Sequence, residues 1–242
     1  MGRYQGSIMG LLWSFLNPVL LLTVYTLVFS GVFKSRWAGA DTGHTQFAVV
    51  LFSGMLVHGL FAEVLNRAPS IVVGNGSYVK KVVFPLEVLS VVSLGASLFH
   101  TAVSLIVLVL ASLLLNGAVP WTLVLLPVVL LPLCILSLGC SWVLASLGVY
   151  LRDVGQVVGV LTTVLLFLSP VFFPLSAIPE RWRSVMLANP LTFIIEQSRN
   201  VLIWGRLPDW TGLGLYCLAA LLFAWLGYAW FQKTRKGFAD VL

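Results

Sequence analysis

Six runs of apolar residues, separated by charged or Pro- and Gly-rich breaks, constrain this chain more than any other feature. A helix needs about 20 apolar residues to cross a hydrocarbon layer about 30 Å thick. Charged residues make up only 9% of the 242 residues, against roughly 25% in soluble domains, which excludes a soluble globule. We therefore expect one all-α integral membrane domain, residues 1–242, with six membrane-spanning helices at residues 11–33, 47–65, 88–115, 121–150, 154–173 and 213–231.

The Lys and Arg residues between these runs indicate which side of the membrane holds the two ends. The short loops of one side hold only Lys34 and Arg36, and the long segment before the last run adds four arginines. The other side, which includes both ends, carries Arg3, Arg67, Lys80, Lys81, Arg152, Lys233, Arg235 and Lys236. Since cytoplasmic loops are enriched in Lys and Arg, both termini are predicted to be cytoplasmic.

Residues 1–17 show the spacing of an amphipathic helix, which predicts an N-terminal interfacial segment. Asn17 followed by Pro18 fits a helix cap and first position, yet residues 18–33 are too few to span comfortably. Three interpretations stay open. Pro18 kinks one long helix, an interfacial helix turns into a short span there, or the first span simply begins among the lipid headgroups.

The largest predicted cytoplasmic loop, residues 66–87, contains Lys80 and Lys81. A loop of this size can dock a partner protein, or its lysines can serve only to fix the topology. Charge alone favours the second interpretation.

The external segment at 174–207 predicts two short amphipathic helices that together form a hairpin. One begins at Pro179 and ends near Ala188, and Asn189-Pro190 caps a second that runs to about Trp204. Each is expected to carry its charges opposite an apolar face, and neither is long enough to cross a bilayer. The hairpin is either a gate over an external exit or an inert amphipathic loop, which sequence alone slightly favours.

No arrangement of residues typical of catalysis or metal binding occurs in the sequence. Paired carboxylates, catalytic triads and a phosphate-binding Gly-rich loop are all missing, so we expect a protein that is not an enzyme, with no catalytic residues, metal or cofactor. All eight carboxylates fall in loops or at the ends of the apolar runs, which argues against an ion-driven carrier. His58 and His100 lie inside runs and are interpreted as hydrogen-bonded packing residues.

Two groups of aromatic residues occur, one in the first run and one in the outer half of the fifth. Tyr25, Phe29 and Phe33 form a four-residue stripe, and a second group follows at Phe167, Phe172 and Phe173. Aromatic faces can support sugar rings along a passage, although ordinary packing or lipid contact explains them equally simply. Composition alone favours packing.

Short motifs follow one another in order along nearly the whole chain, and they are Arg3-Tyr4-Gln5-Gly6-Ser7, Gly10, Trp13, Asn17-Pro18, Val28-Phe29-Ser30, Lys80-Lys81-Val82-Val83-Phe84-Pro85, Arg152-Asp153-Val154, Ser169-Pro170-Val171-Phe172 and Asn189-Pro190-Leu191. In this order they resemble the permease subunit of bacterial ABC exporters for polysaccharides. That family exports O-antigen, capsule and teichoic-acid chains.

The resemblance implies a homodimer in the bacterial inner membrane, paired with two separate subunits that bind ATP and Mg and hydrolyse the ATP. The dimer would enclose a channel for a glycan attached to undecaprenyl pyrophosphate, as in O-antigen export during lipopolysaccharide biosynthesis. Its expected partners are therefore a second copy, two ATPase subunits, the lipid-linked polysaccharide and membrane lipid, with no nucleic acid.

The resemblance also assigns roles to residues of this chain. The first and fifth spans, with the six aromatic residues named above, would line the channel. Lys80, Lys81, Phe84 and Pro85 would belong to the loop that meets the ATPase. The anionic pyrophosphate would be steered by Arg3, Tyr4, Lys80 and Lys81, and the external gate would contain Pro179, Arg181, Trp182, Asn189, Pro190 and Arg199.

Family members usually carry an amphipathic interface helix ahead of the Arg-Tyr motif, whereas this sequence begins at Met1-Gly2-Arg3. Either the start site is misassigned or the helix has been lost. Two rival functions also stay open. One is an ABC permease for drugs or small lipids, and the other is a membrane enzyme acting on polyprenyl-linked sugars.

Overall fold

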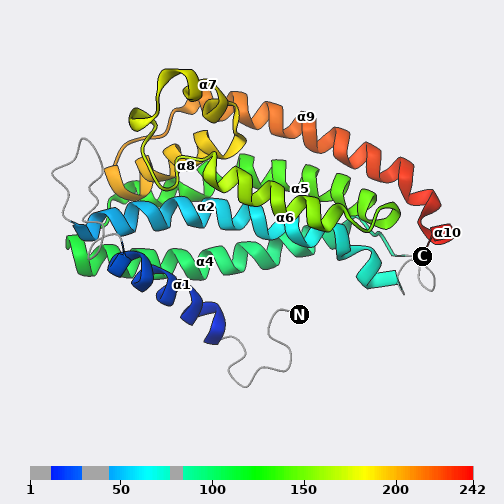
Figure 1. The fold of residues 1–242 in the computed structure, drawn as a ribbon, viewed down its shortest axis with the longest axis horizontal. Helices are drawn as coiled ribbons and strands as arrows, with labels where there is room; N and C mark the ends of the chain where they lie inside the picture. Colours follow the sequence, from blue (N-terminus) through cyan, green and yellow to red (C-terminus); the bar gives the residue numbers. More distant parts are fainter. Residues whose placement is uncertain (1–11, 29–43, 77–83, 242) are drawn as a thin grey trace.

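The computed structural model describes residues 12–28, 44–76 and 84–241 (Figure 1). These residues are mostly helical and include no strand, which confirms the all-α prediction for the described part of the chain. The long helices lie side by side along one axis, as expected when each must satisfy its own backbone hydrogen bonds in an apolar surrounding.

Within the described residues, four helices are long and apolar enough to cross a membrane. They correspond to the second, third, fourth and sixth apolar runs and are α2 (His44–Ile71), α4 (Val88–Asn116), α5 (Leu126–Tyr150) and α9 (Trp210–Thr234). A 3₁₀ turn, η3 (Trp121–Leu125), leads directly into α5. The four long helices therefore account for four of the six predicted spans.

The first and fifth runs form shorter helices, α1 (Leu12–Tyr25) and α6 (Val154–Phe167), each of 14 residues. Pro18 lies inside α1, so among the three open interpretations the described residues support a helix that runs through Pro18. A proline inside a helix removes one backbone hydrogen bond, which neighbouring elements can offset in a membrane bundle. Residues 1–11, most of the predicted interfacial segment, lie outside the described residues.

Two predicted boundaries differ from the structure. Helix α2 continues to Ile71, where a loop was predicted from residue 66, because Arg67 pairs with Glu63 one turn earlier and so does not end the helix (2.6 Å). Helix α6 ends at Phe167 rather than near 173, because Pro170 cannot donate a backbone hydrogen bond in a continued helix.

Helix α2 is the centre of the bundle. It contacts α1, α4, α5, α6 and a short helix near the end of the chain, α8 (Pro190–Arg199). Figure 1 shows α2 between α4 on one side and α5 with α6 on the other. The central apolar cluster is built around α2 residues such as Val57, Leu60 and Val64, all nearly inaccessible. Since neighbouring helices enclose most of α2, a polar face of α2 that stays exposed is a candidate functional site.

Helix α9 packs along α5 at very short range through small residues. A Cβ atom added to Gly139 would lie 2.8 Å from Cα of Ala224, and one added to Gly227 would lie 2.5 Å from the Gly139 carbonyl oxygen. Small residues at such crossings let helix backbones approach each other closely. The outer face of α9 is apolar and exposed, with Leu215, Leu218 and Trp225 among its side chains, as expected for contact with lipid.

Candidate functional site

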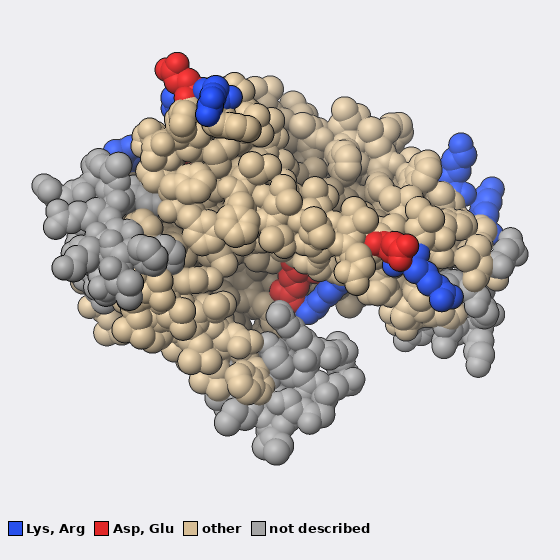
Figure 2. Space-filling view, viewed as in Figure 1, with Lys and Arg blue, Asp and Glu red and all other residues tan. Residues whose placement is uncertain are grey.

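The described charged side chains gather toward the two ends of the bundle, with one further group in a hollow between them (Figure 2). These three places contain most of the described residues for which the sequence predicts a role. They are the region around the end of α6, the opposite end where α5 and α9 finish, and the hollow beside α2.

Two short helices follow α6 in the chain at this end of the bundle. They are α7 (Glu180–Ala188) and α8 (Pro190–Arg199), and a π-helical turn, η5 (Asn200–Trp204), continues α8. Gly205 ends this turn with a φ of 61°, a conformation that glycine adopts without a steric cost. Figure 1 shows both short helices beside the same end of the bundle.

Asn189 connects the start of α8 to the end of α6. Its Oδ1 accepts a hydrogen bond from the Leu191 amide (2.9 Å), which caps α8. Its Nδ2 donates to the carbonyl oxygens of Leu165 (3.2 Å) and Leu168 (3.0 Å) and to Oγ of Ser169 (2.9 Å). One buried amide therefore serves the ends of two helices.

Arg199, at the end of α8, is buried, and only 1% of its surface is exposed. Its guanidinium donates to the carbonyl oxygens of Pro170 (2.6 Å), Val171 (3.0 Å) and Val50 (3.3 Å). Nη1 also donates to Oε1 of Glu196 (3.2 Å). Burial lowers the pKa of Arg199 to about 10, a shift that Glu196 opposes, so the guanidinium remains charged at neutral pH.

The prediction that Arg199 lies on a charged outer face of the hairpin is therefore wrong. The irregular chain after α6 leaves backbone carbonyl groups without helical partners, and buried carbonyl groups need donors. Arginine carries five N–H donors in a planar fork, so one side chain can serve several carbonyls. No spacing pattern in the sequence indicates this role, because the carbonyl groups come from distant parts of the chain.

The other residues predicted for the external gate lie at the surface or at helix starts. Arg181 and Trp182 are exposed in the first turn of α7, and the Arg181 guanidinium carbon lies 5.8 Å from the Trp182 ring centre. Pro179 precedes α7 in an extended conformation, and Pro190 is the first residue of α8. The structure thus separates the six residues into an inner pair, Asn189 and Arg199, and four outer residues.

Two of the aromatic residues described at this end lie against α2. Phe167 and Phe172 stack with ring centres 5.7 Å apart and planes at 26°. Tyr25 and Phe172 both pack on the buried cluster formed by Phe47, Val50 and Leu51, so the two aromatic groups predicted from separate runs do meet at one helix. Phe173 is half-buried, whereas Phe29 and Phe33 lie outside the described residues.

At the opposite end, the C-terminal segment holds the last residues of the predicted ATPase-coupling loop. Arg235 pairs with Glu87 (3.1 Å) and donates to the Phe84 carbonyl oxygen (3.3 Å). Trp142 of α5 donates to the Glu87 carbonyl oxygen (3.1 Å). Pro85 is exposed beside this contact. Sequence reasoning missed Glu87 and Trp142, and it used Arg235 only as a topology signal.

The same end is closed by aromatic packing. Phe238 is fully buried between Tyr150 of α5 and Phe231 of α9, and the Tyr150 hydroxyl donates to the Thr234 carbonyl oxygen (3.0 Å). Lys80, Lys81, Arg3 and Tyr4, predicted for ATPase coupling and pyrophosphate steering, lie outside the described residues.

The hollow beside α2 contains a hydrogen-bonded ionisable group. Oε1 of Glu63 lies 2.8 Å from Nδ1 of His100 on α4 and 2.6 Å from Nη2 of Arg67. Glu63 lies inside a candidate span, Phe47–Ile71. The prediction that every carboxylate lies in a loop or at the end of a span is therefore wrong. Extension of α2 beyond residue 65 accounts for the difference.

The interpretation of both intramembrane histidines as hydrogen-bonded residues is confirmed. His58 donates from Nε2 to the Thr162 carbonyl oxygen of α6 (3.0 Å), and His100 meets Glu63 as described. Within the described ranges, no three His, Cys, Asp or Glu side chains are grouped closely enough to hold a metal ion.

Comparisons with known proteins give one consistent result. A model of the family described as ABC-2 type transporter matches residues 1–203. The O-antigen export system permease protein RfbA of Myxococcus xanthus is 30% identical over 240 residues, covering 98% of this chain and 90% of that protein. A Klebsiella pneumoniae protein of the same name is 24% identical, covering 99% and 90%. The polysialic acid transport protein KpsM of Escherichia coli is 23% identical, covering 97% and 89%.

Proposed function

The chain belongs to the ABC-2 type transporter family, and from that premise we propose that it is the membrane-spanning permease of an ATP-driven polysaccharide exporter. One observation carries the proposal. The similarity to proteins named for O-antigen export and polysialic acid transport extends over almost the full length of both chains in each comparison. An exported glycan is therefore a better-supported cargo than a drug or a small lipid.

The finer features of the proposal follow from the family resemblance. Two copies enclose the channel in the bacterial inner membrane, with both termini in the cytoplasm. The cargo is a polysaccharide attached to undecaprenyl pyrophosphate. Two separate ATP-binding subunits supply the energy and hold ATP and Mg, because this chain has no Gly-rich phosphate loop of its own.

The contacts at the two ends of the bundle suggest how motion passes through the chain. Closure of the ATP-binding subunits pushes on the loop that finishes at Phe84 and Glu87. Because Arg235 and Trp142 hold this part of the loop, the push reaches α5 and α9 together. At the other end, Asn189 and Arg199 tie α8 to the end of α6, so these two helices move as one unit when an exit opens.

A deletion strain tests the proposal. Removal of the gene in a strain without a paralogue should leave lipid-linked polysaccharide on the cytoplasmic side and none at the surface, and a plasmid copy should restore export. Surface polysaccharide is measured by antibody or lectin binding to intact cells and compared with permeabilised cells. Normal surface polysaccharide in the deletion strain would contradict the proposal.

A further inference from the structure

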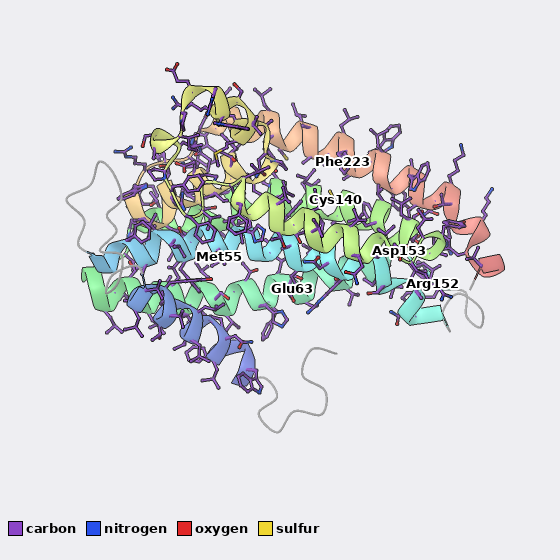
Figure 3. All side chains as sticks on the ribbon, viewed as in Figure 1. Met55, Glu63, Cys140, Arg152, Asp153 and Phe223 are labelled. Atoms are coloured by element: carbon purple, nitrogen blue, oxygen red, sulfur yellow. The ribbon has the colours of Figure 1, made fainter. Side chains whose placement is uncertain are left out.

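Polar side chains meet where α2, α4 and α6 come together. Figure 2 shows an acidic and a basic side chain inside a hollow of the viewed face, and Figure 3, drawn from the same side, labels Glu63 at that place. The residues concerned, here called the polar strip, are Glu63, Asn66 and Arg67 of α2 and His100 of α4.

The polar strip lies within the membrane-spanning length of both helices. At a rise of 1.5 Å per residue, Glu63 is about 24 Å from Phe47 and about 12 Å from Ile71, the ends of its candidate span. His100 is about 18 Å from Val88, the start of its own span. Ionisable groups at such depth are costly, and they usually face the bundle interior or a water-filled passage.

The polar strip also occupies an open face of an otherwise enclosed helix. Asn66 is exposed, the Arg67 side chain is 34% accessible, and Glu63 and His100 are partly accessible. One turn before Glu63, Gly59 is exposed, and a Cβ atom added there would meet nothing within 4 Å. These positions recur at intervals of three and four, so they share one face of α2.

Among the described residues, the hydrogen-bond contacts of the Asn66 side chain are long. Its amide nitrogen and oxygen both lie 3.4 Å from Oγ1 of Thr162 on α6, while that hydroxyl lies 3.0 Å from the carbonyl oxygens of Val158 and Gly159. Hydrogen bonds of ordinary strength are shorter than 3.2 Å. A ligand hydroxyl at normal distance can therefore replace the Thr162 contact at little cost.

We propose that the polar strip is a binding site for the hydroxyl groups of the glycan as it passes α2, an assignment that rests on the proposed export function. The strip combines an amide, a carboxylate, an imidazole and a guanidinium, so it can both donate and accept, as neighbouring sugar hydroxyls do. The positive charge of Arg67 is balanced by Glu63, with which it is paired. The group of the strip that is classed as exposed is the neutral amide of Asn66, which suits a neutral, hydroxyl-rich chain better than an anionic phosphate.

The experiment uses the full permease with its ATP-binding subunits in proteoliposomes. ATP hydrolysis is measured against increasing lipid-linked polysaccharide extracted from the native organism. Asn66→Ala removes one exposed amide and should raise the half-maximal concentration about three- to tenfold, the equivalent of one lost hydrogen bond. Asn66→Gln keeps the amide and should recover part of the loss. Leu218→Ala, on the exposed face of α9, should leave the wild-type value unchanged.

A second variant, Glu63→Gln, should raise the same concentration and is checked by size-exclusion chromatography, because Glu63 also pairs with two neighbours. If no lipid-linked glycan stimulates the wild type, the proposed function fails. If the wild type responds and Asn66→Ala has the wild-type half-maximal concentration, only the glycan site is wrong. An equal shift for undecaprenyl pyrophosphate without sugars would also overturn it, in favour of headgroup binding.

Discussion

Arg199 donates from Nη1 to the carbonyl oxygen of Pro170 over 2.6 Å, which joins the last residue of α8 to the irregular chain that follows α6. The two residues are 29 positions apart. Together with the Asn189 contacts to Leu165 and Leu168, this bond joins the end of α6 to the short helix α8.

The first prediction concerns the buried guanidinium. Arg199→Ala leaves the buried carbonyl groups of Pro170 and Val171 without this donor, each at a cost of about 1–3 kcal/mol. The Val50 carbonyl keeps its hydrogen bond from Oγ of Ser53, so the purified protein should lose at least about 2 kcal/mol of stability, measured as a fall in unfolding temperature in detergent. Arg206→Ala, at an exposed arginine of the same end, is the matched control and should unfold like the wild type. Equal unfolding temperatures for the two variants would contradict the assignment.

The second prediction concerns the double cap. Asn189→Asp keeps the acceptor for the Leu191 amide but replaces the donating amide with a carboxylate that faces the carbonyl oxygens of Leu165 and Leu168. It should be more destabilising than Asn189→Ala, which only removes the contacts, since like partial charges then oppose each other in a buried place. Unfolding temperatures of the two variants measure the difference. An unfolding temperature for Asn189→Asp equal to or above that of Asn189→Ala would contradict the prediction.

The third prediction concerns the crossing of α5 and α9. Gly227→Ala places a Cβ atom 2.5 Å from the Gly139 carbonyl oxygen, so the helices must separate, at a cost of about 1–3 kcal/mol. Gly214→Ala, in the same helix, meets nothing within 4 Å and should be neutral or slightly stabilising. Unfolding temperatures measure both, and a neutral Gly227→Ala would show that the crossing is looser than described.

The fourth prediction concerns coupling and rests on the proposed function. Arg235→Glu places a second negative charge beside Glu87 and should reduce glycan-stimulated ATP hydrolysis. The variant should still fold, because a partly exposed ion pair contributes only about 0–1 kcal/mol to stability. The double variant Glu87→Arg/Arg235→Glu should restore stimulation by reversing the pair. Lys233→Glu, an exposed change of the same charge, is the control. Failure of the double variant to recover would mean that the pair is not the coupling element.

The fifth prediction concerns the stacked aromatics and also rests on the proposed function. Phe172→Ala/Phe173→Ala should reduce polymer export, because it removes the ring that stacks on Phe167 and a half-buried neighbour. Surface polysaccharide on intact cells is the readout, with the amount of permease in the membrane measured by immunoblotting. Trp225→Ala, on the exposed face of α9, controls for loss of an aromatic ring. Unaltered export by the double variant would show that these two rings do not contribute to the passage of the polymer.

Helix positions could be predicted where the residues of the segment itself decide them. The apolar runs predicted the four long helices, and the Pro and Asn residues at 179 and 189–190 predicted where the two short helices begin. They failed at residue 66, where charge normally ends a span. Glu63 and Arg67 offset each other across one helical turn, so α2 continues for six residues past the predicted boundary at 65, to Ile71.

By itself the sequence determined that the chain is a helical membrane protein, because the length and hydropathy of each run act locally. The sequence also carries the motifs of the exporter family. Only the tertiary structure decided where the charged residues go. Arg199 is buried because distant carbonyl groups need its donors, and Glu63 meets His100 because α2 and α4 cross there. Such pairings depend on which helices become neighbours, and the spacing of residues along one helix does not indicate its neighbours.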